Sequence, residues 1–170
     1  MKRYTLFATA LAALSGCAVL PPVPIAVADL SPTQGSTVNG TVTFVERSGK
    51  LMVDGHFKGL APGQHGIHIH EKGDCSAGDG MSAGGPFNPL GKPHADPSTK
   101  DRHAGDMPML VAGAAGNAEL TVELDVITVG AGVTDVVGKS IIVHKDPDDF
   151  KTQPTGNSGA RVACGVIRRA

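Results

Sequence analysis

Between Glu71 and Met107 the chain is dense in Gly, Pro, Asp and Ser and contains almost no apolar run. Such a segment predicts neither a helix nor a strand of the core, because it has no periodic apolar face to bury. A loop of this length is uncommon in a compact domain, and it is generally functional or held in place by a metal or a disulfide. The rest of the fold must therefore provide a rigid scaffold for a long loop.

Glycine and proline argue against a helical scaffold. The chain has 23 Gly and 12 Pro among 170 residues, and both residue types destabilise the interior of a helix. Alternating apolar and polar residues predict strands instead, beginning with a β-hairpin whose turn is Ser48-Gly49-Lys50. The segments with strand character are 37–45, 51–57, 65–70, 118–129, 140–144 and 161–167.

A second polar loop, 145–159, separates the last two predicted strands. The length of the chain suits one domain with a real core. We therefore expect an all-β fold, an antiparallel Greek-key β-sandwich or flattened barrel, with two long functional loops over one face.

The N-terminus predicts export and a lipid anchor. Two basic residues and a short apolar run lead to Leu14-Ser15-Gly16-Cys17, which resembles the lipobox at which bacterial lipoproteins are cleaved and acylated. The alternative is an ordinary signal peptide in which Cys17 is incidental. The predicted organisation is a lipoprotein-type signal peptide over 1–17 ending at Cys17, a Pro-rich tether over 18–34 and a domain over 35–170.

The chain has three cysteines, an odd number for an exported protein. If Cys17 carries a lipid, Cys75 and Cys164 remain free to pair in an oxidising compartment. We therefore expect one disulfide, which would join the start of the long loop to the last strand. By the chain-entropy model it would contribute roughly 4 kcal/mol to stability.

Three histidines on predicted strands indicate a copper site. His68 and His70 are two residues apart, so on a strand their imidazoles project from the same face. His144 ends a predicted buried strand. Neutral imidazole suits copper, and three such ligands leave an open position for chemistry. For the His-x-His pair alone, a solvated strand face would be an equally good interpretation.

A second cluster, His94, His103 and Asp106, lies inside the long loop. Two imidazoles and one carboxylate suit zinc, which would order a loop that has no core of its own. A loop that simply carries surface His and Asp is the alternative.

The overall charge argues against nucleic acid as a partner. The formal net charge is −1 at pH 7 and the basic residues are dispersed, so we expect no nucleic-acid binding. Contact with a membrane is expected only through the N-terminal lipid.

Five segments, taken together, resemble consecutive signatures of the copper/zinc superoxide dismutases, in that family's order and over about residues 36–167. The implied fold agrees with the strand pattern, and the lipobox places the chain in the bacterial, exported, lipoprotein-type branch. The segments are HGIHIHEKGDC (65–75), SAGGPFNPLGKPH (82–94), RHAGDMP (102–108), IIVHKDPDDF (141–150) and GNSGARVACGVI (156–167).

The resemblance assigns a role to each matching position. It implies that Arg161 attracts the superoxide anion beside the copper and that the Asp148 carboxylate hydrogen-bonds one copper-binding and one zinc-binding imidazole. It also implies the disulfide between Cys75 and Cys164. His65 matches a position that does not bind metal, and His56 is expected on the surface of a strand. The implied ligands are His68, His70 and His144 for copper and His94, His103 and Asp106 for zinc.

The chain departs from the family at Pro86. The family carries there a histidine whose imidazolate bridges copper and zinc, and proline has no nitrogen to offer a metal. His56 and His65 lie on strands before the copper motif, so we expect neither to replace it. The bridge is therefore expected to be absent, with weaker zinc retention and a slower reaction.

The resemblance implies an enzyme that dismutates superoxide to oxygen and hydrogen peroxide, with copper and zinc as cofactors, in the periplasm or cell envelope. The alternative is a copper-binding or copper-buffering lipoprotein with little activity. Arg161 favours the enzyme, because a copper store needs no cation beside the metal. A zinc hydrolase lacks an evident general base. Family dimers with differing interfaces exist, so a homodimer is left open by the sequence.

Overall fold

The computed structural model describes residues 23–170; the predicted signal peptide, Cys17 and residues 18–22 of the tether lie outside this range. The described part is all-β apart from one 3-10 turn, η1 (Met81–Ala83). Within it, no helix is long and apolar enough to cross a membrane. The strands are β1 (Pro24–Pro32), β2 (Asn39–Arg47), β3 (Lys50–Lys58), β4 (Gly63–His65), β5 (Ile67–His70), β6 (Leu110–Ala112), β7 (Ala118–Glu123), β8 (Ser140–His144), β9 (Arg161–Val166) and β10 (Arg168–Arg169).

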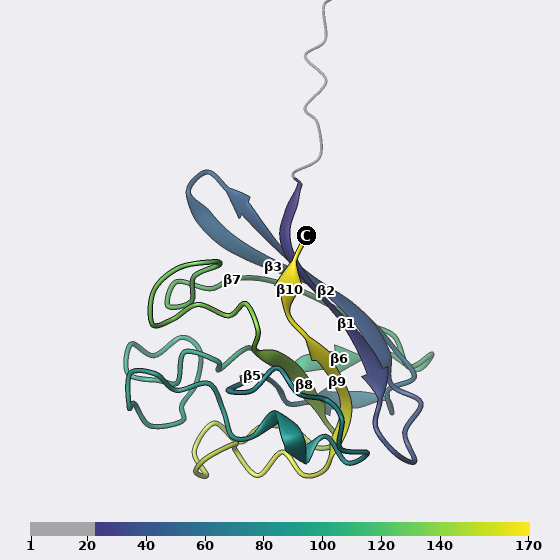
Figure 1. The fold of residues 1–170 in the computed structure, drawn as a ribbon. Coiled ribbons are helices and arrows are strands. Elements are labelled where there is room, and N and C mark those ends of the chain that lie inside the picture. Colours follow the sequence, from purple (N-terminus) through teal and green to yellow (C-terminus); the bar gives the residue numbers. More distant parts are fainter. Residues whose placement is uncertain (1–22) are drawn as a thin grey trace, which may run out of the picture.

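The main sheet is antiparallel and curls into a half-barrel (Figure 1). Its strands lie in the order β5-β8-β9-β1-β2-β3-β7, and β10 pairs with β1. The chain crosses from β3, near one end of this order, to β5 at the other, which is a connection typical of Greek-key folds. The β2–β3 hairpin has the predicted turn, since Arg47 pairs with Lys50. The predicted all-β fold class is confirmed.

One sequence-based boundary is wrong. Residues 24–32 were expected to belong to the tether, but they form β1, which pairs with β2 over most of its length and with β9 at its end. Ala26, Ala28 and Leu30 are buried in the core. The domain therefore begins before position 35, and two of the four prolines that suggested a tether, Pro24 and Pro32, stand at the ends of the strand, where a missing N–H costs least.

β5 is anchored in the core through one of its faces, which holds the side chains on its other face rigidly. Ile67 and Ile69 face the main apolar cluster, while the alternate positions His68 and His70 face the opposite side. All four residues are buried, because the long loops cover that second face. The segments 71–109 and 145–160 contain no strand, as expected for the two long loops.

The predicted disulfide is present between Cys75 and Cys164. It joins the beginning of the first long loop to β9. The same loop is anchored to β5 at a second place, where Phe87 N donates to Ile69 O at 2.8 Å. The loop is thus attached to the sheet on both sides of η1.

Candidate metal centre

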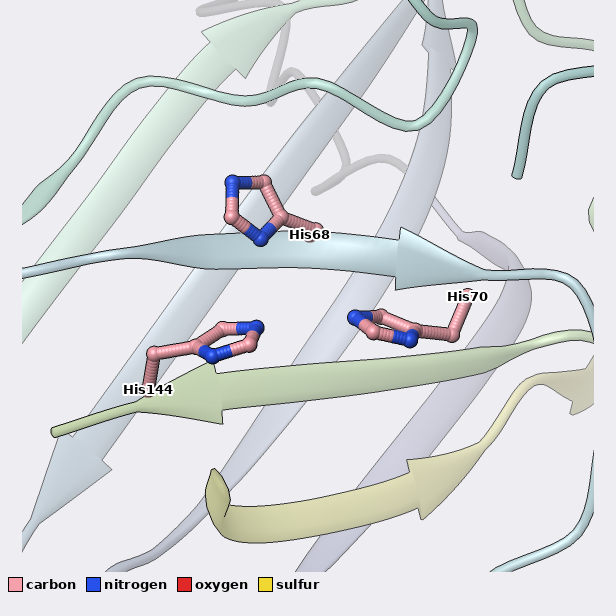
Figure 2. A group of neighbouring side chains, drawn as sticks. All are labelled: His68, His70 and His144. Carbon is pink, nitrogen blue, oxygen red and sulfur yellow. The ribbon is translucent and has the colours of Figure 1, made fainter. Parts of the chain in front are cut away.

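Three imidazoles from two paired strands converge on one point (Figure 2). His68 and His70 project from β5, and His144 ends β8, which pairs with β5. The ring centroids of His68 and His144 are 4.9 Å apart, and those of His70 and His144 are 5.6 Å apart. One ligand nitrogen of each ring lies within 4.8 Å of the other two. Adjacent strands therefore place three ligands where one ion can be bound.

Each of these rings is held through its other nitrogen. His68 Nε2 donates to Asp148 Oδ2 at 2.7 Å, His70 Nδ1 to Gly84 O at 3.0 Å and His144 Nδ1 to Gly159 O at 3.3 Å. The remaining nitrogens, His68 Nδ1, His70 Nε2 and His144 Nε2, are buried and have no hydrogen-bond partner. Unpartnered buried nitrogens that share one point are the donor set that a metal ion would satisfy.

Burial keeps two of these imidazoles neutral. It lowers the pKa of His70 to about 2 and the pKa of His144 to about 3, although the hydrogen bonds that these rings donate to Gly84 O and Gly159 O act in the opposite direction. A neutral imidazole has a free lone pair for a metal. The cluster is therefore ready to bind a cation without first releasing a proton.

His94, His103 and Asp106 form a second cluster inside the first long loop. His94 Nδ1 lies 2.9 Å and His103 Nδ1 3.3 Å from Asp106 Oδ1. Burial opposes the charged forms of His94 and Asp106. Hydrogen bonds to Asp106 and Asp148 nevertheless raise the pKa of His94 to about 9, and hydrogen bonds from His103 and His94 lower the pKa of Asp106 to about 2. Without an ion, His94 thus carries a proton that neutralises the carboxylate, and two nitrogens and one oxygen are the ligands that zinc accepts.

Asp148 connects the two clusters. Its Oδ2 accepts from His68 and its Oδ1 accepts from His94 at 2.9 Å, and Phe150 N donates to the same Oδ1. Burial opposes the ionised form, but the hydrogen bonds from His68 and His94 hold the pKa of Asp148 well below its usual range. The carboxylate therefore orients one ring of each cluster.

Arg161 lies beside the three-histidine cluster. A cavity of about 440 Å³ is lined by Arg161 and His144 together with Asp79 and Met81. The guanidinium donates to Gly80 O at 2.8 Å and to Gly84 O at 2.7 Å. Burial lowers the pKa of Arg161 somewhat, yet a guanidinium keeps its charge. A fixed positive charge thus faces the cavity from which the cluster is reached.

The sequence model of the family described as copper/zinc superoxide dismutase (SODC) matches residues 38–167, well over half of the chain. The chain belongs to the copper/zinc superoxide dismutase family. A model of the prokaryotic membrane lipoprotein lipid attachment site matches residues 1–18.

Two relatives extend the similarity over nearly the whole chain. An extracellular copper/zinc superoxide dismutase of Brugia pahangi is 38% identical over 151 residues, which cover 84% of this chain and 74% of the relative. The crystal structure of the clock protein EA4 matches with a TM-score of 0.78 and 36% identity, covering 91% of this chain and 99% of the other. The cofactors of the family, copper and zinc, fit the two clusters of ligands.

Position 86 lies next to the three-histidine cluster of this family member. Pro86 stands opposite His70 in an isolated antiparallel bridge, and the following residue, Phe87, pairs with β5. A histidine at position 86 would therefore begin from backbone adjacent to His70. Proline offers no ligand there.

The other two histidines lie as expected. His65 is buried, and its two ring nitrogens face carbonyl oxygens, His144 O at 3.1 Å and Ala61 O at 2.8 Å. The side chain of His56 is 72% exposed on β3. Sequence reasoning missed the carbonyls of three glycines, which hold the side chains of the site in place: Gly80 and Gly84 for Arg161, Gly84 for His70 and Gly159 for His144. A backbone acceptor has no signature in a sequence.

Proposed function

We propose that the chain dismutates superoxide in the envelope of a bacterium, with copper held by His68, His70 and His144. One observation carries the proposal: three unpartnered, buried imidazole nitrogens converge, and His144, one of the three, lines a cavity together with the fixed guanidinium of Arg161. When bound, copper supplies the one-electron chemistry by which one superoxide is oxidised to oxygen and a second takes up that electron and two protons to give hydrogen peroxide. Every other part of the reaction depends on the residues around it.

Arg161 is the residue we assign to the anion. Its two terminal nitrogens are fixed by carbonyls of the loop, so its charge stays beside His144. A positive group in a cleft raises the local concentration of an anionic substrate. Superoxide dismutases are a known example of such electrostatic steering. A protein that only stored copper would gain nothing from this charge.

His94, His103 and Asp106 are the residues we assign to zinc. They supply three ligands, which leaves a fourth position of a tetrahedral shell to water. Asp148 would then hold the rings of His94 and His68 in a fixed relation, because it accepts a hydrogen bond from each. The role of the zinc site would be to order the loop.

Pro86 would remove the bridge between the two sites and one source of a proton. A bridging imidazole can hold a proton at its nitrogen and release it to the departing peroxide, and a proline ring cannot. Solvent in the cavity beside Arg161 must then deliver both protons. We infer a slower reaction and weaker zinc retention than in a family member that carries histidine at this position.

A second candidate function, a copper-binding or copper-buffering lipoprotein with little catalysis, is favoured by Pro86 alone. The lipid attachment site supports an envelope protein anchored to a membrane, and we place it in the periplasm. Whether the chain forms a homodimer does not affect the site, because all the residues assigned to it lie in one chain.

The deciding experiment is superoxide consumption by the purified protein loaded with copper, with and without zinc. The proposal predicts catalytic consumption that requires copper and persists, more slowly, without zinc. Stoichiometric consumption that stops after one turnover would support the copper-buffering alternative. His144→Gln serves as the control, because it removes one proposed copper ligand and should abolish turnover.

A further inference from the structure

We propose that the end of the domain at which β1 begins rests against a phospholipid surface. In this arrangement β1 is a rigid spacer, and the cavity beside Arg161 opens away from the membrane. β1 begins close to the lipid anchor and ends beside Arg161, and the side chains near its two ends differ accordingly.

The chain between the anchor and the domain is short. The lipid attachment site matches residues 1–18, and its Cys17 is followed by five residues before the first described residue, Val23. Even a fully extended chain advances only about 3.6 Å per residue, so the six steps from the acylated Cys17 place Val23 within about 22 Å of it. Because β1 starts at Pro24 and is paired with β2 from that residue on, the domain cannot move far from the lipid.

Other segments share this end of the domain. Pro24 pairs with Val45, so the β2–β3 turn after Arg47 extends beyond the start of β1, and the last residue, Ala170, donates to Ile25 O. Figure 1 shows the turn and the C-terminus beside the start of β1. Val23 is 79% exposed and Ile25 36% exposed. We call these residues, 23–25, 46–50 and 168–170, the proximal end.

The charges at the proximal end are largely balanced. Arg47 pairs with Asp54, Lys50 with Glu123 and Arg168 with Asp29. Such an end has no strong preference for anionic lipid, unlike a polybasic segment. The lipid must therefore supply the attachment, and the proximal end faces a neutral headgroup surface as readily as a charged one.

The opposite end of β1 reaches the metal centre. Ser31 and Pro32 pair with Cys164 and Ala163, and Thr33 Oγ1 donates to Arg161 O at 2.7 Å. A strand rises about 3.3 Å per residue, so the eight steps from Pro24 to Pro32 span about 26 Å. Figure 1 shows both long loops and η1 at the end of the molecule remote from the start of β1.

The outer face of the sheet opposes a flat orientation. It carries polar side chains along β1, β2 and β3, including Asp29, Thr41 and His56, and these are exposed. Laying this face on a bilayer would remove water from charged groups without burying apolar surface in return. An orientation with the proximal end toward the lipid avoids that cost.

The orientation has a consequence for the substrate, which rests on the proposed function. Anionic lipids repel superoxide, but their potential falls off over about 8 Å at physiological ionic strength. A cavity some 26 Å from the proximal end lies beyond that range. Superoxide would therefore reach Arg161 from the aqueous side, at a rate that does not depend on the charge of the lipids.

The test places one fluorescent donor at each end of the lipidated full-length protein. Glu46→Cys marks the proximal end and Lys151→Cys the loop over the metal centre; both positions are exposed, and the native disulfide does not react with a maleimide dye. The protein is bound to phosphatidylcholine vesicles that contain a headgroup-labelled acceptor lipid. We expect energy transfer to be severalfold faster from position 46 than from position 151, in neutral and in anionic vesicles alike.

Cys17→Ala is the control and should leave the protein in solution. Equal transfer from the two positions, or faster transfer from 151, would overturn the proposal, as would failure of the lipidated protein to bind vesicles. Transfer from position 46 that changes with the density of bound protein would indicate contact with a second copy instead, and would also overturn it. None of these outcomes depends on dismutase activity, so the orientation and the proposed function can fail separately.

Discussion

We expect the side chain at position 86 to decide whether the two metal clusters share a ligand. His70 and Pro86 are bridge partners, so the side chain at 86 starts beside the three-histidine cluster. Pro86 provides no such ligand, and the clusters are connected through Asp148, which accepts from His68 and His94, and through the rings of His68 and His94, whose centroids are 5.6 Å apart. A hydrogen-bonded carboxylate would orient the ligands of both sites, but it would not itself be a ligand shared by two metals.

Pro86→His should therefore strengthen zinc binding and speed superoxide consumption. Loss of a partner that merely orients a ligand already costs 10–100-fold in metal affinity, so adding a ligand should raise zinc affinity by at least about tenfold. The measurement is competition against a zinc chelator, together with the rate in the copper-loaded protein. Pro86→Ala is the matched control, because it removes the proline ring without adding a nitrogen. If both variants behave like the parent chain, the assignment of this position is wrong.

In the proposed function Arg161 acts through its charge and through its two hydrogen bonds, and substitution can separate these roles. Arg161→Gln removes the charge and should lower the rate severalfold, with a weaker dependence on salt, while copper binding by the three imidazoles is retained. Arg161→Lys keeps the charge but cannot bond Gly80 O and Gly84 O in the same fixed geometry. The rate of the lysine variant should fall between the rates of the parent chain and of the glutamine variant. A glutamine variant with an unchanged rate and salt dependence would exclude a role in anion attraction.

Among the elements, β1 shows what the sequence could and could not predict. Its inward positions Ala26, Ala28 and Leu30 alternate with outward ones, which is the same signal that correctly predicted the β2–β3 hairpin. The flanking prolines hid this signal, because proline is rare inside a strand but tolerated at its ends. Small alanines also give a weak apolar pattern. Here pairing with β2 and β9 outweighed local propensity.

The long loops show a different limit of sequence reasoning. Candidate ligands could be proposed from the sequence because metal binding requires particular residue types, and the structure brings His94, His103 and Asp106 together. The path of the loops was not predictable, since it is fixed by backbone contacts such as those of Gly84 O with His70 and Arg161. Any residue provides a carbonyl, so its position becomes known only from the fold.

The disulfide should stabilise the fold through the first loop. Cys75 and Cys164 are 89 residues apart, and closing a loop of this size removes about 4–5 kcal/mol of chain entropy from the unfolded state. The double variant Cys75→Ser/Cys164→Ser should lose a stability of that order in denaturant unfolding of the metal-free protein. Its copper-loaded form should also be slower, because Gly80 and Gly84, which fix Arg161, lie on the same loop. An unchanged midpoint would show that the metal-free fold does not depend on this link.

For the whole molecule, the buried imidazoles predict how the stability of the metal-free protein depends on pH. Burial lowers the pKa of His70 to about 2 and the pKa of His144 to about 3, from an unfolded value near 6.5. Below pH 6.5 the unfolded chain therefore takes up protons that the folded chain does not. The free energy of unfolding should fall as the pH is lowered from 6.5 towards 4, by at most about 1.4 kcal/mol per pH unit for each ring.

His94 acts in the opposite direction on the alkaline side of the same curve. Asp106 and Asp148 outweigh burial and raise its pKa to about 9, so between pH 6.5 and 9 the folded state keeps a proton that the unfolded state has released. Its contribution is complete below pH 6.5 and is lost as the pH rises to 9. Metal-free stability should therefore be greatest near pH 6.5, as measured by denaturant unfolding between pH 4.5 and 9. Zinc loading provides the control: a zinc-bound His94 no longer carries the extra proton, so the alkaline loss should disappear, and a metal-free curve that keeps rising to pH 9 would contradict the assignment.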